Sequence, residues 1–534
     1  MQEKSVLILG AGLMQKPAII SAKNLNLHTF VIDANPSAEG VPYADDFCRI
    51  DLKDREGILR YAAELKEKAN LKGIFTAGTD FSSSVSYAAE KLGFPSHSFD
   101  ASLNASIKSR MRRCFKDADV PSPEFFTISK ESVSSEKLKF ITQSLGFPCV
   151  VKPVDNMGAR GCRMIRNENE VMPSVSVALE NSRSGTAIIE KYMEGPEFSI
   201  DAIVYNGTVT ITGFADRHIF YPPYFIETGH TMPTALSDES KKLELISCFA
   251  AGINALGLTT GAAKADIKYT KNGAEIGEIA ARLSGGYMSG WTYPYSSGCN
   301  LTEQALKIAV GEEPDYILKN RFPLPVKNSP FELFILPSEK VSAERAWISI
   351  PGKIKSIDGL DGASKISGIK NVFPRSVKAG DEIDFPRNNV QKCGNVISLN
   401  SDYDLSVSEA EKSCSKVLIR LEPNNIKTDD FLNGKTLPDE EGFPPAAFSA
   451  FSKLSEFSVP SEIPENESVL NNLSPEFLAL LKSPERDWNY LTAYETAHRF
   501  DLLVPVHPSL DGKKFWSALL KGGIQGAIYI SDSI

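Results

Sequence analysis

The sequence lacks long apolar runs, and this absence excludes several classes of protein. None of its apolar stretches approaches the roughly 20 residues that a membrane-spanning helix needs. Near the start, the charged Glu3 and Lys4 lead directly into a short apolar run, without the long apolar core of a secretory signal. We therefore expect a cytoplasmic protein without a membrane partner.

Metal-binding and disulfide patterns are also missing. The eight cysteines contain no Cys-x-x-Cys pair, and only six histidines accompany them. This scatter argues against a structural zinc ion and against a disulfide framework. A formal net charge of -9 argues against nucleic acid as the main partner, because a phosphate backbone requires a basic surface. ATP needs only local positive charge and stays compatible with this composition.

A chain of 534 residues is too long for one hydrophobic core, so several domains are expected. Apolar, β-rich runs in the first hundred residues alternate with amphipathic helices, which predicts a doubly wound parallel sheet over residues 1–100. The predicted strands are 5–9, 28–33, 47–50 and 73–76, and the predicted helices begin at about residue 15 and cover 54–69.

The turn Gly10-Ala11-Gly12 with Asp33 suggests a dinucleotide-binding fingerprint, and hence a nicotinamide-dependent oxidoreductase. Gln15 stands at the third glycine position, where its side chain would crowd the contact between helix and strand. A structural turn or a substrate-facing loop is therefore favoured over a dinucleotide site, and no hydride-acceptor site is evident elsewhere.

The rest of the chain divides at changes in pattern. We predict a small α+β lobe, a larger lobe, a mostly β domain, and a C-terminal α/β segment, over residues 101–185, 186–325, 326–423 and 424–534 respectively. The predicted helices include 105–118 and 241–256. Residues 424–465, rich in polar residues and proline, predict a linker, and residues 526–530 predict a final strand.

Lys152 is the most informative residue. It ends a β-branched run and precedes the loop 155–161, which contains Gly158 and Gly161. Backbone N–H groups of such a loop can cradle phosphate oxygens while the ammonium group neutralises their charge. Alone this pattern is weak, but further elements follow it at orderly distances.

Asp266 and Glu278 lie on two strand-like runs joined by a turn at Asn272-Gly273, a strong hairpin signal. Adjacent strands would place the two carboxylates side by side, as oxygen ligands for Mg²⁺. Arg282, followed by Gly285, could stabilise a transferring phosphoryl group. The alternative is an exposed cross-strand pair, which explains one carboxylate but poorly both together with the arginine.

The segment 188–201 predicts a strand, an irregular stretch and a second strand. Such a stretch could present backbone groups and Met193 to a flat base, with Glu190 and Lys191 before it. Glu197 could accept hydrogen bonds from ribose hydroxyl groups. An exposed acidic hairpin explains this segment equally well when it is taken alone.

Taken in order, these motifs resemble the ATP-grasp superfamily over about residues 1–420. The resemblance implies a doubly wound domain, two lobes that enclose ATP, and a C-terminal domain. It implies contacts to the phosphates by Lys108, Lys152 and the loop with Gly158 and Gly161. It further implies adenine and ribose contacts by Glu190, Lys191, Met193 and Glu197, and Mg²⁺ ligation by Asp266 and Glu278, with Mn²⁺ as a substitute.

Within the superfamily, residues 225–233 and 278–286 resemble the L-amino acid ligases. Most members have an asparagine where this chain has Ala280, which puts a second magnesium ion in question. The resemblance implies that Glu227 or His230 binds the substrate ammonium or deprotonates the amine. A buried structural histidine is an equal alternative for His230. Arg282 and the Gly285 N–H would hold an acyl phosphate.

The implied reaction joins a small carboxylate to an amine through an acyl phosphate, with release of ADP and phosphate, in a homodimer. Two alternatives are weighed against it: a nucleotide-binding regulatory module without turnover, and bicarbonate activation of the biotin carboxylase type. The sequence leaves open both substrates and the role of residues 424–534.

Overall fold

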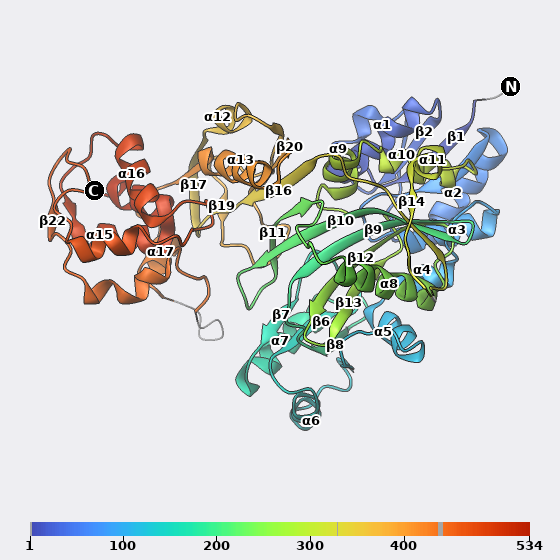
Figure 1. The fold of residues 1–534 in the computed structure, drawn as a ribbon, viewed down its shortest axis with the longest axis horizontal. Helices are drawn as coiled ribbons and strands as arrows, with labels where there is room; N and C mark the ends of the chain where they lie inside the picture. Colours follow the sequence, from blue (N-terminus) through green and yellow to red (C-terminus); the bar gives the residue numbers. More distant parts are fainter. Residues whose placement is uncertain (1–2, 328, 436–441) are drawn as a thin grey trace.

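The computed structural model describes residues 3–327, 329–435 and 442–534. Figure 1 shows an elongated molecule, with the N-terminal domain at one end and the last helices at the other. The two lobes expected to enclose a ligand lie between them. Within the described ranges, no helix is long and apolar enough to cross a membrane.

The N-terminal domain contains the expected parallel sheet, in the order β3-β2-β1-β4. Its strands are β1 (Ser5–Leu9), β2 (His28–Asp33), β3 (Asp46–Arg49) and β4 (Leu71–Phe75). Helices α1 (Lys16–Asn24), α2 (Arg55–Lys68) and α3 (Ser82–Leu92) pack beside it. The apolar runs are buried on both faces of the sheet, which is why they read as continuous.

The turn after β1 is held by its own side chains. The Asp33 carboxylate accepts a hydrogen bond from the Ala11 N–H (2.8 Å), and the buried Gln15 side chain accepts one from the Ala77 N–H (2.8 Å). Because Gln15 lies against Gly10, these contacts fit the structural turn that the sequence favoured over a dinucleotide site.

The small lobe is a four-stranded sheet in the order β5-β8-β6-β7. Its strands are β5 (Phe125–Ser129), β6 (Cys149–Pro153), β7 (Arg163–Ile165) and β8 (Thr186–Lys191), and its helices are α6 (Ser135–Leu145) and α7 (Val171–Glu180). Apolar side chains of both helices and of the strands form a separate core. The lobe therefore has its own packing and is a distinct body in Figure 1.

The helix expected over residues 105–118 is instead two helices, α4 (Phe99–Ser106) and α5 (Lys108–Asp117). Ile107 between them is extended, with φ −111° and ψ 107°. The Lys108 N–H donates to the Val154 carbonyl oxygen (2.9 Å), just past the strand that carries Lys152. This tertiary hydrogen bond replaces a helical one and fixes the start of α5 beside β6.

The larger lobe is built on a sheet with the order β13-β12-β9-β10-β11-β16-β20-β18. Helix α8 (Glu239–Leu256), predicted from its periodicity, packs on β12 and β13. The strands of the lobe are β9 (Glu197–Tyr205), β10 (Thr208–Phe220), β11 (Ile226–Met232), β12 (Gly261–Thr270) and β13 (Gly273–Ala280). Strand β11 pairs with β16, so the sheet runs on into the next domain without a break.

That next domain is mostly β, as expected. It adds β16 (Val341–Trp347), β18 (Ile369–Pro374) and β20 (Gly394–Asn400) to the large sheet, and forms a small sheet from β17 (Gly352–Asp358), β19 (Glu382–Ile383) and β21 (Leu418–Leu421). Its helices are α12 (Leu360–Ser364) and α13 (Tyr403–Lys416). The connection from the larger lobe contains α9 (Tyr293–Ser297), α10 (Leu301–Ala309), α11 (Asp315–Asn320), β14 (Phe322–Pro323) and β15 (Glu332–Ile335).

The C-terminal segment is helical. Its described residues contain α14 (Ile426–Leu432), α15 (Pro475–Leu481), α16 (Ala493–Leu503) and α17 (Gly512–Asp532), and the two-residue strands β22 (Glu462–Ile463) and β23 (Leu510–Asp511). The strand expected at 526–530 is wrong, because these residues lie in α17. A short, fully buried apolar run has no period that separates strand from helix. Gly523 interrupts the helix at φ 59°, a backbone conformation suited to glycine.

The linker expected at 424–465 is also wrong for its described residues. Phe443, Phe448 and Leu454 are buried in one core together with Trp347 and Trp516. Residues 436–441 lie outside the described part of the chain. The domain boundaries stay predictions, but side chains from both sides of residue 423 share this core.

Gln525 connects α17 to the preceding domain through buried hydrogen bonds. Its amide nitrogen donates to the Ser349 hydroxyl (2.8 Å) and the Ile419 carbonyl (2.9 Å), and its oxygen accepts from the Ile350 N–H (3.2 Å). Gln525→Leu should lower the stability by about 1–3 kcal/mol for each buried group left unpaired. Chemical denaturation followed by tryptophan fluorescence measures the loss.

The control is Gln143→Leu on α6, an exposed position where a change of about 0.5 kcal/mol or less is expected. If the two variants lost equal stability, Gln525 would not hold α17 to the domain.

Candidate functional site

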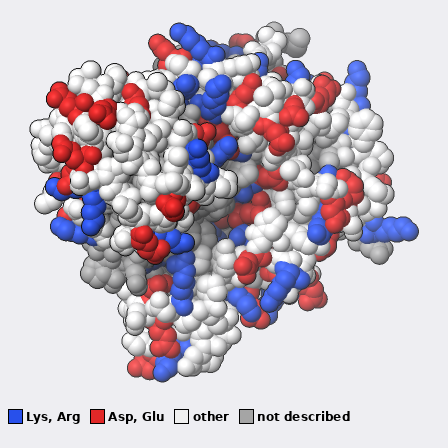
Figure 2. Space-filling model, turned by 60° about the vertical axis from the view of Figure 1, so that its left-hand side comes forward, with Lys and Arg blue, Asp and Glu red and all other residues white. Residues whose placement is uncertain are grey.

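A cavity of about 690 Å³ lies where the lobes, the N-terminal domain and the mostly β domain meet. Figure 2 shows a hollow in the surface with acidic and basic side chains gathered around it. The volume lies within the range of small-molecule sites. Met14, Lys152, Asp266 and Arg375 each line the cavity from a different one of these regions.

The two predicted lysines lie at one end of the cavity. Lys152, at the end of β6, lies 2.6 Å from the Glu190 carboxylate, and Lys108 lies 3.4 Å from that of Glu278. Burial lowers the pKa of Lys108, but Glu278 and Asp80 outweigh burial and raise it above its ordinary value. The ammonium group therefore stays charged although its side chain is mostly buried.

The Glu190 side chain, for which the sequence predicted an adenine contact, is held in two ion pairs. Its carboxylate binds both Lys152 and the buried Arg112 guanidinium (2.8 Å). Burial raises the pKa of Glu190, but Arg112 and Lys152 outweigh burial and lower it. Glu190 thus fixes the position of Lys152, and the neighbouring Lys191 and Met193 line the cavity.

Strands β8 and β9, on either side of residues 192–196, belong to different sheets. The alternative of one exposed acidic hairpin is therefore wrong. Glu197, the predicted ribose acid, lies at the start of β9 and is paired with Arg217 (2.7 Å) and Lys268 (3.4 Å). It lines the cavity at the point where the chain passes from the small lobe to the large one.

The glycine loop lies over the lysine end of the cavity. Gly158 (φ +65°) and Gly161 (φ +68°) have left-handed backbones, and a Cβ atom at Gly161 would lie 2.8 Å from Asn181. Gly158 lines the cavity, whereas Gly161 supports the loop from behind. The Gly158 carbonyl accepts a hydrogen bond from the Asn389 N–H (3.0 Å), so the loop tip contacts the mostly β domain.

The hairpin prediction is confirmed: Asp266 and Glu278 are direct partners on β12 and β13. Both line the cavity rather than an exposed face. Burial raises the pKa of Glu278, but Lys108 and the other nearby cations lower it to about 2. Two adjacent carboxyl groups beside Lys108 and Lys152 fit a divalent cation that shares phosphate oxygens.

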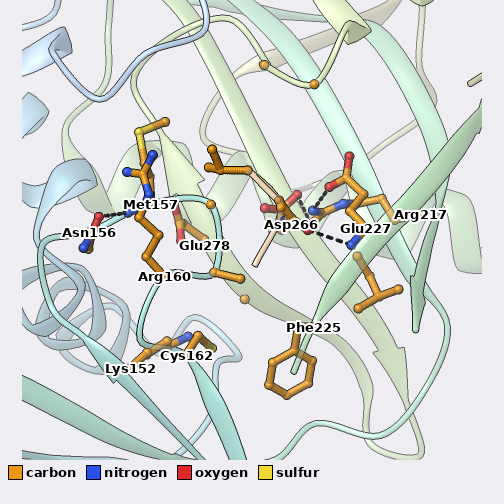
Figure 3. Close-up of a pocket in the computed structure, with 18 of the residues that line it drawn as sticks. Lys152, Asn156, Met157, Arg160, Cys162, Arg217, Phe225, Glu227, Asp266 and Glu278 are labelled. Carbon is orange, nitrogen blue, oxygen red and sulfur yellow. Dashed lines mark hydrogen bonds and ion pairs between the residues drawn. The ribbon is translucent and has the colours of Figure 1, made fainter. Parts of the chain in front are cut away.

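Figure 3 shows a second charged cluster at the other end of the cavity, where Arg217 lies between Glu227 and Asp266. Arg217 also binds Glu197, its partner across β9 and β10. Burial raises the pKa of Glu227, but Arg217 outweighs burial and holds it well below its ordinary value. Glu227 is therefore an ionised acid at the cavity wall.

His230 lies behind Glu227 and does not line the cavity. Its ring nitrogens lie 2.8 Å from the Thr292 hydroxyl and 3.2 Å from the buried Glu344 carboxylate. Among the described residues, Glu227, His230 and Glu344 form the group close enough to share a metal ion. Arg217 already neutralises Glu227. The geometry therefore fits the buried structural histidine that the sequence left as the alternative for His230.

Arg282 and Gly285 lie on the loop after β13 and line the cavity. The Arg282 side chain donates to the Leu283 carbonyl (3.0 Å) and lies 3.4 Å from Asp80. Asp201 holds the same loop, because its carboxylate accepts hydrogen bonds from the Ser284 N–H (3.1 Å) and hydroxyl (2.6 Å). Burial raises the pKa of Asp201 to about 6.

Most predicted site residues therefore meet around one cavity; Gly161 and His230 support it from behind. Several cavity residues were not predicted from the sequence, among them Arg217 on β10. Every second residue of β12 from 264 to 268 is charged, namely Lys264, Asp266 and Lys268, so these side chains share one face of the strand. This pattern is visible in the sequence. Arg375, Asn389 and Lys392 come from the mostly β domain, and no sequence spacing relates them to Lys152.

Comparison with known families agrees with this geometry. Residues 145–290 match the ATP-grasp domain, and residues 346–422 match the L-amino acid ligase C-terminal domain 2. The ATP-grasp match covers Lys152, the segment 190–197, the hairpin of β12 and β13, and Arg282. The match to the L-amino acid ligase C-terminal domain 2 covers Arg375 and Lys392, which lie next to β18 and β20.

Similarity to individual proteins is distant but extends over much of the chain. Protein y4rH of Sinorhizobium fredii is 20% identical over 378 residues, 70% of this chain and 73% of that protein. Carnosine synthase 1 of Mus musculus is 24% identical over 59% of this chain but only 40% of its own length. The L-amino acid ligase of Bacillus licheniformis, 17% identical, has the same fold over 79% of this chain and 100% of its own, with a TM-score of 0.65.

Asp201 gives a pH-dependent test of the loop. An acid whose pKa is higher when folded than when unfolded loses stability as pH rises between the two values. For Asp201 the pH range of this loss runs from about 4 to about 6. Relative to the wild type, Asp201→Asn should therefore gain up to about 3 kcal/mol of stability across this range. Thermal unfolding at several pH values measures the trend.

Asp404→Asn, at an exposed position on α13, should leave the pH profile of the wild type unchanged. A parallel profile for Asp201→Asn would mean that Asp201 does not titrate in the folded protein as described.

Proposed function

We propose that this chain, an ATP-grasp protein with an L-amino acid ligase C-terminal domain, is an ATP-dependent ligase that joins the carboxylate of an amino acid to an amine. The observation that supports this most is one cavity lined by Lys108, Lys152 and Glu278 at one end and by Glu227 at the other, with Asp266 between them. These groups serve a polyphosphate with its metal ion and a substrate ammonium.

At the nucleotide end, Lys152 and Lys108 neutralise phosphate charge while the loop 155–161 covers the phosphates. Met193 and Lys191 line the adenine position, and Glu197 lies where it can accept hydrogen bonds from the ribose. The carboxylates that now pair with the lysines hold them in place before the nucleotide binds. Catalysis of phosphoryl transfer depends mainly on such positioning and charge.

Asp266 and Glu278 are the residues that would hold Mg²⁺, for which Mn²⁺ can substitute. When bound, the metal ion neutralises charge on the phosphates of ATP. Ala280 offers no ligand atom on the same strand, so phosphate oxygens and water would complete the coordination.

At the substrate end, Glu227 binds the substrate ammonium, since its carboxylate is ionised and lines the cavity. Arg282 and the Gly285 N–H stabilise negative charge on the acyl phosphate. The amine then displaces phosphate to form the amide. His230 positions Glu227 from behind.

Further parts of the proposal rest on the resemblance. We place the protein in the cytoplasm as a homodimer that acts on small carboxylates and amines and not on nucleic acid. A regulatory module without turnover is not favoured, because the expected phosphate-binding and metal-binding residues are present except at Ala280. Bicarbonate activation is not favoured either, since residues 346–422 match the C-terminal domain 2 of L-amino acid ligases.

Lys152→Ala tests the nucleotide end. Loss of its charge should lower ADP release by about 100-fold or more, the scale on which single transition-state contacts act. The assay measures ADP and phosphate with Mg²⁺ and a panel of paired amino acids. The exposed Lys137→Ala in the same lobe should retain wild-type rates. Full activity of Lys152→Ala would refute the proposed phosphate contact.

Asn389 connects the loop tip to the substrate end, because its side-chain oxygen accepts from the Glu227 N–H (2.8 Å) while its own N–H donates to Gly158. Asn389→Ala keeps the backbone hydrogen bond to Gly158 but removes the side-chain hydrogen bond that anchors residue 389 to Glu227. Since a closed loop keeps water from the acyl phosphate, loss of this anchor should raise ADP released per amide formed by about 2–10-fold, the value of one hydrogen bond. The exposed Asn471→Ala serves as control. An unchanged ratio would show that closure does not depend on Asn389.

A further inference from the structure

Four of the cations that line the cavity have no ion pair with a carboxylate among the described residues, and two of these four are not exposed. Most of the cations that line the cavity are in ion pairs: Lys108, Lys152, Arg217, Lys264, Lys268 and Arg282. Arg375 and Lys392, both from the mostly β domain, line it without one. Arg160 and Lys191 are also without an ion pair, but they are exposed at the nucleotide end.

Arg375 and Lys392 lie on adjacent segments. Arg375 directly follows β18, and its N–H donates to the carbonyl of Cys393 (3.0 Å), the residue next to Lys392. The Arg375 guanidinium donates from one Nη atom to the Val390 carbonyl (3.1 Å), and its Nε is buried without a partner. The Lys392 ammonium donates to the Glu227 carbonyl oxygen (2.7 Å). Neutral carbonyls thus hold both cations and leave donors for a ligand.

An unpaired cation in this position is unfavourable by itself. Lys392 is only 5% exposed, and burial lowers its pKa by more than the nearby Glu344 and Glu227 carboxylates raise it. Burying a charge without a counter-ion costs free energy unless another charge compensates it. A ligand anion would supply that charge, and a guanidinium is suited to a carboxylate because it can donate two parallel hydrogen bonds.

The two cations belong to the substrate end. The charges with the largest influence on Lys392 are Glu344, Glu227, Arg375 and Arg217, whereas those on Glu278 are Lys108, Lys264, Lys152 and Arg282. Lys392 also contacts the backbone of Glu227 directly. An anion held here would therefore lie beside the proposed ammonium site rather than on the nucleotide phosphates.

We propose that Arg375 and Lys392 bind a second substrate carboxylate, distinct from the one that becomes activated. The inference rests on the proposed ligase function. This carboxylate belongs either to the side chain of an acidic amino acid that is activated or to the α-carboxylate of the amino acid that supplies the amine. Both sources present the same group to Arg375, and substrates with and without it tell them apart.

The experiment compares Arg375→Gln with the wild type in steady-state ADP release. Each acidic substrate is paired with its neutral amide: glutamate with glutamine, aspartate with asparagine, and alanine with alaninamide as the amine. The wild type should prefer the carboxylate member of one pair. Arg375→Gln should raise KM for that member by about 10–100-fold, the effect expected for a charged hydrogen bond, and change KM for the amide by about 2-fold or less.

Arg375→Lys should restore part of the preference, and the exposed Arg60→Gln should have none of these effects. A preference in the glutamate or aspartate pair identifies a side-chain carboxylate, and one in the alanine pair identifies the amine substrate. Equal effects of Arg375→Gln on both members of every pair would overturn the proposal. So would weaker binding of Mg²⁺–ADP by Arg375→Gln, because Arg375 would then serve the nucleotide.

Failure of the ligase function itself gives a different result, namely no ADP release from the wild type with any pair. In that case thermal shift with the same amino acids and amides decides. A shift by a carboxylate member that is present in the wild type and absent in Arg375→Gln supports the anion site. No difference between the two proteins overturns it.

Discussion

The buried Arg112 guanidinium is the contact on which the geometry of the site depends. It lies on α5, binds Glu190 of the small lobe, and donates to the Gly277 carbonyl (2.6 Å) of the large lobe. At 1% exposure this charge is stable only because Glu190 neutralises it. The same carboxylate holds Lys152, so one buried pair sets both the approach of the lobes and the position of this lysine in the cavity.

Most of the charged side chains of the cavity balance one another in ion pairs. Lys152 and Lys108 are each paired with a carboxylate, and Asp266 is paired with Lys264 (2.5 Å). An ATP phosphate chain with its metal ion can exchange these pairs, since lysines would turn to phosphate and carboxylates to the metal. Charged groups that are already held in place need little reorganisation when charge develops during the reaction.

The parts of the site that could be predicted from sequence are those carried by local signals. The strand and glycine loop around Lys152 and the Asn272-Gly273 turn that aligns Asp266 with Glu278 are short-range patterns, and the structure contains both. The break at Ile107 could not be predicted, because a hydrogen bond to the distant Val154 replaces a helical one. The prediction of a strand at 526–530 was wrong because burial of this apolar run removes the periodicity that separates a helix from a strand.

Residues 424–534 gain a role from the same long-range packing. Their helices share a core with Trp347 on β16, and β16 pairs with β11, which carries Glu227 and His230. Strand β20, also paired with β16, begins at Gly394, just after Lys392. A Cβ atom at Gly394 would lie 1.9 Å from the Trp347 ring, so this ring occupies the space that a larger residue would need. The C-terminal helices therefore support the strands that carry or flank Glu227 and Lys392, although none of the described residues of 424–534 lines the cavity itself.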